Sequence, residues 1–161
     1  MFARSLCRII EKSLYVNWEG ISDTADENGI GSWMLYCIKS RNPECLEYLQ
    51  EHTVDRIPPP ECFRDIRQME VEDLQWFYQE VKNRQLYACV VFDIGGMALA
   101  NYAVFGAFDR IFVPTLGDAV SQKKQVVFEQ MLQQEYKNTE NLQYVQLEGQ
   151  DVDQIAEMYV R

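Results

Sequence analysis

The sequence has a single histidine and little positive charge, and each shortage argues against a class of function. His52 is the only histidine, which argues against a Ser-His-Asp triad and against a metal site with several histidine ligands. The chain has 15 basic and 25 acidic residues, which give a net charge of −10. This balance disfavours non-specific nucleic-acid binding and polybasic contact with membranes. The five cysteines form no C-x-x-C pair, so we expect reduced thiols rather than zinc ligands.

Long apolar runs are also missing. The longest uncharged stretch, residues 94–108, contains an asparagine and three glycines and is shorter than the roughly 20 residues of a membrane span. The first dozen residues lack the apolar core of a signal peptide. We therefore expect a soluble, cytoplasmic protein. With 47% hydrophobic and 12% aromatic residues, the chain suits one domain over residues 1–161.

Helical and strand-like patterns alternate along the chain. Apolar residues at helical spacing predict helices over residues 2–12, 32–40, 42–52, 70–83, 98–106, 118–136 and 151–159. Strand-like runs occupy residues 13–18, 54–57, 85–94, 110–113 and 142–147. The run over 85–94 has a continuous apolar middle, which is typical of a strand buried on both faces. This order predicts an α/β domain of three layers, with a mainly parallel sheet flanked by helices.

Polar residues follow three of the expected strands. Asp93 ends the run Val-Val-Phe-Asp-Ile-Gly, where a carboxylate can hold magnesium or simply cap the next turn. Pro114 and Thr115 end a later strand, before a helix that Asp118 can cap. Glu19 follows the first strand. Ligands of open α/β sheets bind outside the carboxyl ends of strands, so these three ends form a candidate cleft.

Taken together, these segments resemble the ParA/MinD-type P-loop ATPases, especially the TadZ/CpaE-like bacterial proteins. The resemblance rests on LYVNWE (14–19), VVFDIG (90–95) and FVPTLGDAVS (112–121), and on the S-x-x-K-x-x-x-F-x-x-x-L helix over 121–132. It implies ATP and Mg²⁺ as cofactors. It also implies that Asp93 is the catalytic, metal-binding or water-orienting carboxylate, that Pro114 and Thr115 border the adenine pocket, and that Glu19 lies near the metal.

One defining element of that family is missing. No G-x-x-x-x-G-K-[ST] loop, which would cradle phosphates, occurs in the sequence. Residues 1–6 look like the helix that normally follows this loop. The resemblance therefore implies a P-loop NTPase-like domain that is truncated, lacks its first strand and P-loop, and does not hydrolyse ATP independently. Loss of a central strand would leave unpaired strand edges that need rearranged pairing or a partner.

Two other functions remain open. The domain can be a non-catalytic interaction or dimerisation module, with a protein partner or a second copy of itself. It can also be a receiver-like phosphoacceptor domain with Asp93 as the acceptor. The long separation between Glu19 and Asp93 counts against the second of these, because one strand-helix-strand unit spans only about 30 residues.

Overall fold

The structure is a computed structural model that describes residues 1–19, 26, 28–96, 98–137, 139–147 and 151–160. In chain order the elements are α1 (Phe2–Ile9), β1 (Ser13–Trp18), α2 (Ile30–Ser40), α3 (Glu44–Glu51), β2 (Arg56–Ile57), α4 (Phe63–Ile66), α5 (Val71–Asn83), β3 (Cys89–Ile94), the 3-10 helix η1 (Tyr102–Ala107), β4 (Ile111–Thr115), α6 (Ala119–Glu135), β5 (Leu142–Gln146) and α7 (Val152–Val160). The predicted alternation of helices and strands is confirmed. The loop expected between residues 19 and 31 lies largely outside the described residues.

Two local expectations differ from the structure. Residues 98–106 were expected to form an α-helix, but a 3-10 helix forms over Tyr102–Ala107 instead. The side chain of Asn101 accepts a hydrogen bond from the backbone N–H of Ala103. This cap places the start of the helix at Tyr102 instead of residue 98. The short helix α4 was not predicted, because four residues are too few to show a helical period.

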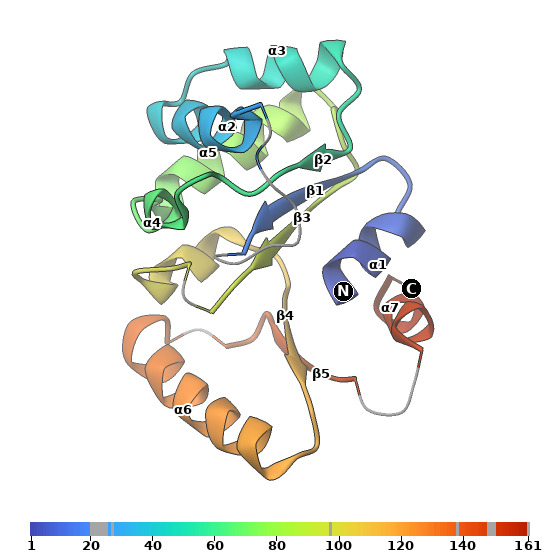
Figure 1. The fold of residues 1–161 in the computed structure, drawn as a ribbon, viewed down its shortest axis with the longest axis vertical. Coiled ribbons are helices and arrows are strands. Elements are labelled where there is room, and N and C mark those ends of the chain that lie inside the picture. The colour runs from blue at the N-terminus through green and yellow to red at the C-terminus, as the bar shows by residue number, and fades with distance from the viewer. Residues whose placement is uncertain (20–25, 27, 97, 138, 148–150, 161) are drawn as a thin grey trace.

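Among the described residues, every strand pairing is parallel, which confirms an α/β fold with parallel strands flanked by helices (Figure 1). The strands are hydrogen-bonded as two sheets, however, in the orders β2-β1-β3 and β4-β5. No backbone pairing joins β3 to β4 within the described residues. The described strands therefore form two separate ladders, with a break between the third and fourth strands.

Side chains connect the two sheets where backbone pairing does not. Val91 of β3 and Phe112 of β4 both pack against the cluster that Phe2 of α1 forms with α7. On the other side, Ile94 of β3 and Val113 of β4 pack against the cluster around η1 and α6. The apolar clusters thus hold β3 and β4 in one domain without a shared ladder of hydrogen bonds.

The main core lies on one face of the first sheet. Alternate residues of β1, Leu14, Val16 and Trp18, point into a cluster formed with α2, α3 and α5. The intervening residues Tyr15 and Asn17 therefore point to the opposite face, on which α1 lies. Helices on both faces explain why five of the six β1 residues are buried.

Strand β3 is less buried than its sequence suggested. Val90 and Phe92 pack against the main cluster and Val91 against the cluster on the other face, but all six residues of Cys89–Ile94 are only partly buried. The reason is position: β3 pairs with β1 on one side and lies at the edge of its sheet. A continuous apolar run shows that a strand can be buried. The number of strands and helices that pack around it decides what fraction of its surface is buried.

Helix α6 also contributes less to the core than its apolar residues suggest. Val120, Val127 and Met131 are 62%, 55% and 40% exposed, and Leu132 is its only buried residue. Figure 1 shows why, since α6 lies along the outside of the smaller sheet. Among the described helices, none combines the length and the apolar character that crossing a bilayer requires.

Candidate functional site

Asp93 is held by a tyrosine from the neighbouring strand. In the parallel register of β1 and β3, Asn17 lies opposite Asp93 and Tyr15 lies opposite Val91. The hydroxyl group of Tyr15 donates a hydrogen bond to Oδ2 of Asp93 at 2.7 Å. Burial is the main cause that raises the pKa of Tyr15 above its ordinary value. The hydroxyl group therefore keeps its proton at neutral pH.

Two arginines flank the Tyr15 ring. The guanidinium carbon of Arg4, from α1, lies 5.7 Å from the ring centroid, and that of Arg56, from β2, lies 5.6 Å from it. Nε of Arg4 also donates to the Tyr15 hydroxyl group at 3.5 Å. Tyr15 therefore links a carboxylate at the end of β3 to positive groups from two other elements.

Glu19 follows β1 at the same end of the sheet as Asp93. Its backbone N–H donates to Oδ1 of Asn17 at 3.0 Å, and the Asn17 side chain is fully buried. This contact shapes the turn after β1 and leaves the Glu19 side chain half-buried. Asp93, the second-last residue of β3, and Glu19, the residue after β1, thus lie at the carboxyl ends of adjacent parallel strands.

Pro114 and Thr115 belong to the other sheet. Thr115 Oγ1 donates to the carbonyl oxygen of Val145 in β5 at 3.4 Å, and Pro114 is exposed. Asp118 caps α6 as expected, because its carboxylate accepts the backbone N–H groups of Val120 and Ser121. No hydrogen bond links Asp93 to Thr115 in the described part of the chain. A nucleotide pocket that unites the two sheets stays a prediction.

Asp93 is the candidate metal-binding carboxylate, and the structure shows what surrounds it. One oxygen of Asp93 accepts the Tyr15 hydroxyl group, and no group of three or more histidine, cysteine or acidic residues suited to a metal ion occurs among the described residues. Mg²⁺ in nucleotide sites is held by one or two carboxylates together with the phosphates. With Oδ2 accepting from Tyr15, Asp93 could offer its other carboxylate oxygen to a metal ion.

Sequence reasoning missed Tyr15, Arg4 and Arg56. The alternation of LYVNWE carried a usable signal, since Tyr15 and Asn17 must share the face opposite the apolar residues. Arg4 and Arg56 had no such signal. They are 52 residues apart, and only the packing of α1 and β2 beside β1 brings both to one tyrosine.

Comparisons with known proteins support the fold. No protein-family model and no curated protein matches the sequence. A ParA family ATPase from Chlorobium tepidum TLS is similar in structure, with a TM-score of 0.62 and 14% identity over 97% of this chain and 72% of that chain. The MinD cell division protein of Aquifex aeolicus gives a TM-score of 0.51 and 14% identity over 97% of this chain and 70% of that chain. The domain therefore shares the overall fold of these two proteins.

Proposed function

We propose that this chain is a ParA/MinD-like ATPase-family domain that does not hydrolyse ATP on its own. The observation that carries the proposal is the absence from the sequence of a G-x-x-x-x-G-K-[ST] loop. In P-loop ATPases the backbone N–H groups and lysine of this loop hold the phosphates. Each charge-assisted contact that is lost removes about 1.5–3 kcal/mol, so tight ATP binding is not expected.

The proposal extends to the type of domain. The motif resemblance supports a bacterial, TadZ/CpaE-like relative, and the likeness to the ParA family ATPase supports the shared fold. The lack of pairing between β3 and β4 in the described residues supports a domain without the family's first strand. In this proposal Asp93 remains the candidate carboxylate for water or Mg²⁺, with Glu19 beside it, and Pro114 and Thr115 border the base.

Mg-ATP and Mg-ADP are expected to leave the thermal melt of the purified chain unchanged. A ligand that binds only the native state at 100 times its Kd adds about 2.7 kcal/mol. In a domain of this size that free energy corresponds to a rise of roughly 5–10 °C, which is easily seen. Phosphate release from ATP is expected to stay at the buffer rate.

The Asp93→Asn variant is the control, because asparagine keeps an oxygen that can accept the Tyr15 hydroxyl group. Its melt is expected to match that of the unmodified chain with and without nucleotide. A rise with Mg-ATP that disappears in this variant would show a working nucleotide site and would contradict the proposal.

A second function, a dimerisation module, is favoured by the surface of α6. Val120, Val127 and Met131 recur at helical spacing and are exposed. The helix carries two lysines and two glutamates, so it is neutral in a chain of net charge −10. Two copies that meet through α6 avoid much of the repulsion that other surfaces of so acidic a chain would bring. We therefore propose a second copy of this chain as the partner of α6.

Light scattering after size-exclusion chromatography tests this contact. The unmodified chain is expected to approach the mass of a dimer as concentration rises, whereas the double variant Val127→Glu/Met131→Glu is expected to stay monomeric. The control Tyr36→Glu/Met158→Glu adds the same charge at exposed apolar residues of α2 and α7 and is expected to dimerise normally. A monomer at every concentration, or equal loss in both variants, would exclude the α6 contact.

A further inference from the structure

The outer edge of the smaller sheet is open at β5. Among the described strands, β5 pairs only with β4. Ile111 donates its backbone N–H to the carbonyl oxygen of Asn141, and Leu147 donates its own to that of Thr115, so the odd-numbered residues of this segment turn their backbone groups toward β4. Successive residues of a strand turn these groups to opposite sides. The N–H and C=O groups of Tyr144 therefore face away from β4, along the open edge.

Strand β5 lacks the features that usually keep an edge strand from pairing with another chain. Its five residues, Leu142–Gln146, include no charged residue and no proline, although the chain has a net charge of −10. Proteins commonly protect such edges with charged side chains, prolines or a covering helix. Gln143 and Tyr144 are exposed, so a partner can reach the strand. An extended segment can therefore add to this sheet through backbone hydrogen bonds.

A pocket of about 230 Å³, called the β5 pocket below, lies beside this edge. Its described lining comes from α6, β5 and the turn between them, namely Glu129, Leu132, Gln133, Thr139, Leu142 and Tyr144. The two leucines give it an apolar part, and the other residues give it polar groups. The β5 pocket is smaller than most small-molecule sites, which begin at about 300 Å³, and suits a single side chain.

Glu129 gives the β5 pocket a negative charge. Its Oε1 accepts a hydrogen bond from Nε2 of Gln125 at 2.9 Å, and no described lysine or arginine forms an ion pair with it. Burial first, and then the neighbouring carboxylate of Glu129, raise the pKa of Tyr144 to about 12. Both neighbours are thus neutral at pH 7, so the charge of Glu129 is left to attract a cation.

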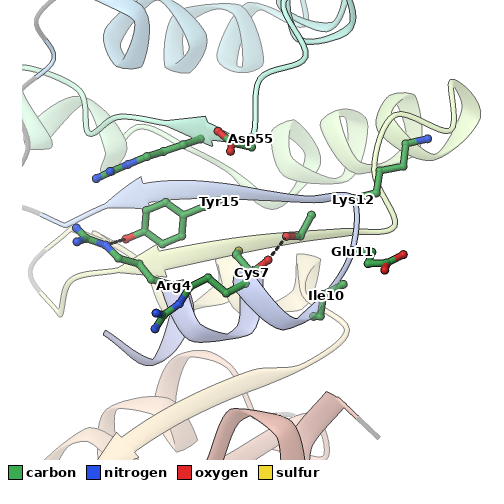
Figure 2. Close-up of a pocket in the computed structure, with 10 residues that line it drawn as sticks. Arg4, Cys7, Ile10, Glu11, Lys12, Tyr15 and Asp55 are labelled. Carbon is green, nitrogen blue, oxygen red and sulfur yellow. Dashed lines mark hydrogen bonds between the residues drawn. The ribbon is translucent and has the colours of Figure 1, made fainter. Parts of the chain in front are cut away.

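The pocket between α1, the start of β1 and the residues at β2 differs, because three of its basic side chains have partners inside the domain (Figure 2). Nε of Arg4 donates to the Tyr15 hydroxyl group, as a dashed line in Figure 2 shows. Arg8 forms an ion pair with Asp153, and Nζ of Lys12 donates to a backbone carbonyl oxygen. These positive charges are used within the domain, so the β5 pocket is the better place for a charged partner to bind.

We propose that β5 binds an extended, positively charged segment of a partner protein, which pairs with the strand edge and places one arginine side chain in the β5 pocket against Glu129. The backbone hydrogen bonds supply affinity, and the pocket supplies specificity. The leucines of the pocket contact the apolar part of the arginine side chain, while its guanidinium group meets the carboxylate.

The charge of the chain selects a basic segment as the occupant. A second copy paired at the same edge would bring two Glu129 carboxylates together, whereas a basic segment neutralises one. The net charge of −10 also attracts a cationic partner over a longer range. On α6, Glu129 lies two residues from Val127 and Met131, about 200° around the helix from each, so this site is independent of the α6 contact proposed above.

Fluorescence anisotropy with a labelled hexapeptide of alternating valine and arginine tests this site at physiological salt. We expect saturable binding to the unmodified chain, and about tenfold weaker binding to Glu129→Gln, because a charge-assisted hydrogen bond becomes a neutral one. The control Glu47→Gln removes the same charge from an exposed position of α3 and is expected to change the Kd less than about twofold. Gln133→Lys puts a positive charge at the exposed side of the pocket and serves if Glu129→Gln does not fold.

Two N-methylated forms of the peptide test the strand pairing, one methylated at the arginine amides and one at the valine amides. In an extended peptide the arginine residues turn their backbone groups to one side and the valine residues to the other. Each methylation therefore removes the N–H donors of one side and keeps every charge. One form is expected to bind at least about tenfold more weakly than the parent peptide, and the other to bind like it.

Three results would overturn the proposal. The first is no saturable binding at millimolar peptide. The second is equal weakening by Glu129→Gln and Glu47→Gln, which would show a general attraction between an acidic chain and a cation. The third is an equal effect of the two methylations, which would exclude pairing with β5 and leave the pocket at most a site for a small cation.

Discussion

Replacing Phe77 with alanine is expected to lower the free energy of unfolding by about 3–5 kcal/mol. Phe77 lies on α5, is 1% exposed, and belongs to the largest apolar cluster of the domain. The change removes the transfer free energy of a buried ring and leaves a cavity that α2, α3 and β1 fill only in part. Urea unfolding followed by far-UV circular dichroism measures the loss.

The neighbouring Tyr78 provides a matched control on the same helix. It is 38% exposed, and its ring contacts Lys82 one turn further on. Tyr78→Ala is expected to cost much less than Phe77→Ala, because more than a third of Tyr78 is already exposed and an exposed cation-π contact contributes only about 0.5–1 kcal/mol. Comparable losses in the two variants would mean that the cluster around Phe77 is not the core of the domain.

Replacing Gly31 with alanine is expected to destabilise the domain by about 2–3 kcal/mol. A Cβ atom at this position would lie 2.6 Å from the carbonyl oxygen and 2.8 Å from the carbonyl carbon of Pro59, and close to the carbonyl oxygen of Pro58. These are backbone atoms that no rotamer change can move. Either α2 or the segment after β2 must shift, and this cost exceeds the gain of about 1 kcal/mol that alanine brings to a helix.

Gly96 is the control for this substitution. A Cβ atom there meets nothing within 4 Å, and the residue does not require a left-handed backbone. Gly96→Ala is expected to leave the denaturation midpoint within the range of ordinary surface changes, about 0.5 kcal/mol. If Gly31→Ala were tolerated equally well, that result would contradict the close contact between α2 and the backbone of Pro58 and Pro59.

Local patterns predicted much of the fold because helices and strands have different periods. The helix over 70–83 and the strand over 13–18 are found close to their expected bounds as α5 and β1. The capping role of Asp118 also followed from sequence, since a carboxylate before an apolar helical run satisfies the first free N–H groups. Each of these features depends on residues that are near in the chain.

The extent of burial could not be predicted in the same way. The continuous apolar run of β3 and the apolar residues of α6 both suggested core positions, yet β3 is an edge strand and α6 is mostly exposed. Burial depends on how many elements pack around a segment, and that number is a property of the whole fold.

By itself, the sequence determined the class of the domain, the alternation of its helices and strands, and the placement of Glu19 and Asp93 at the ends of two strands. These features follow from periodicity and from the rule that parallel strands share one carboxyl edge. Only the tertiary structure decided that Tyr15 holds Asp93 and that Arg4 and Arg56 meet at the Tyr15 ring. These residues come from four elements, α1, β1, β2 and β3, and their side chains meet only because α1, β2 and β3 all lie against β1.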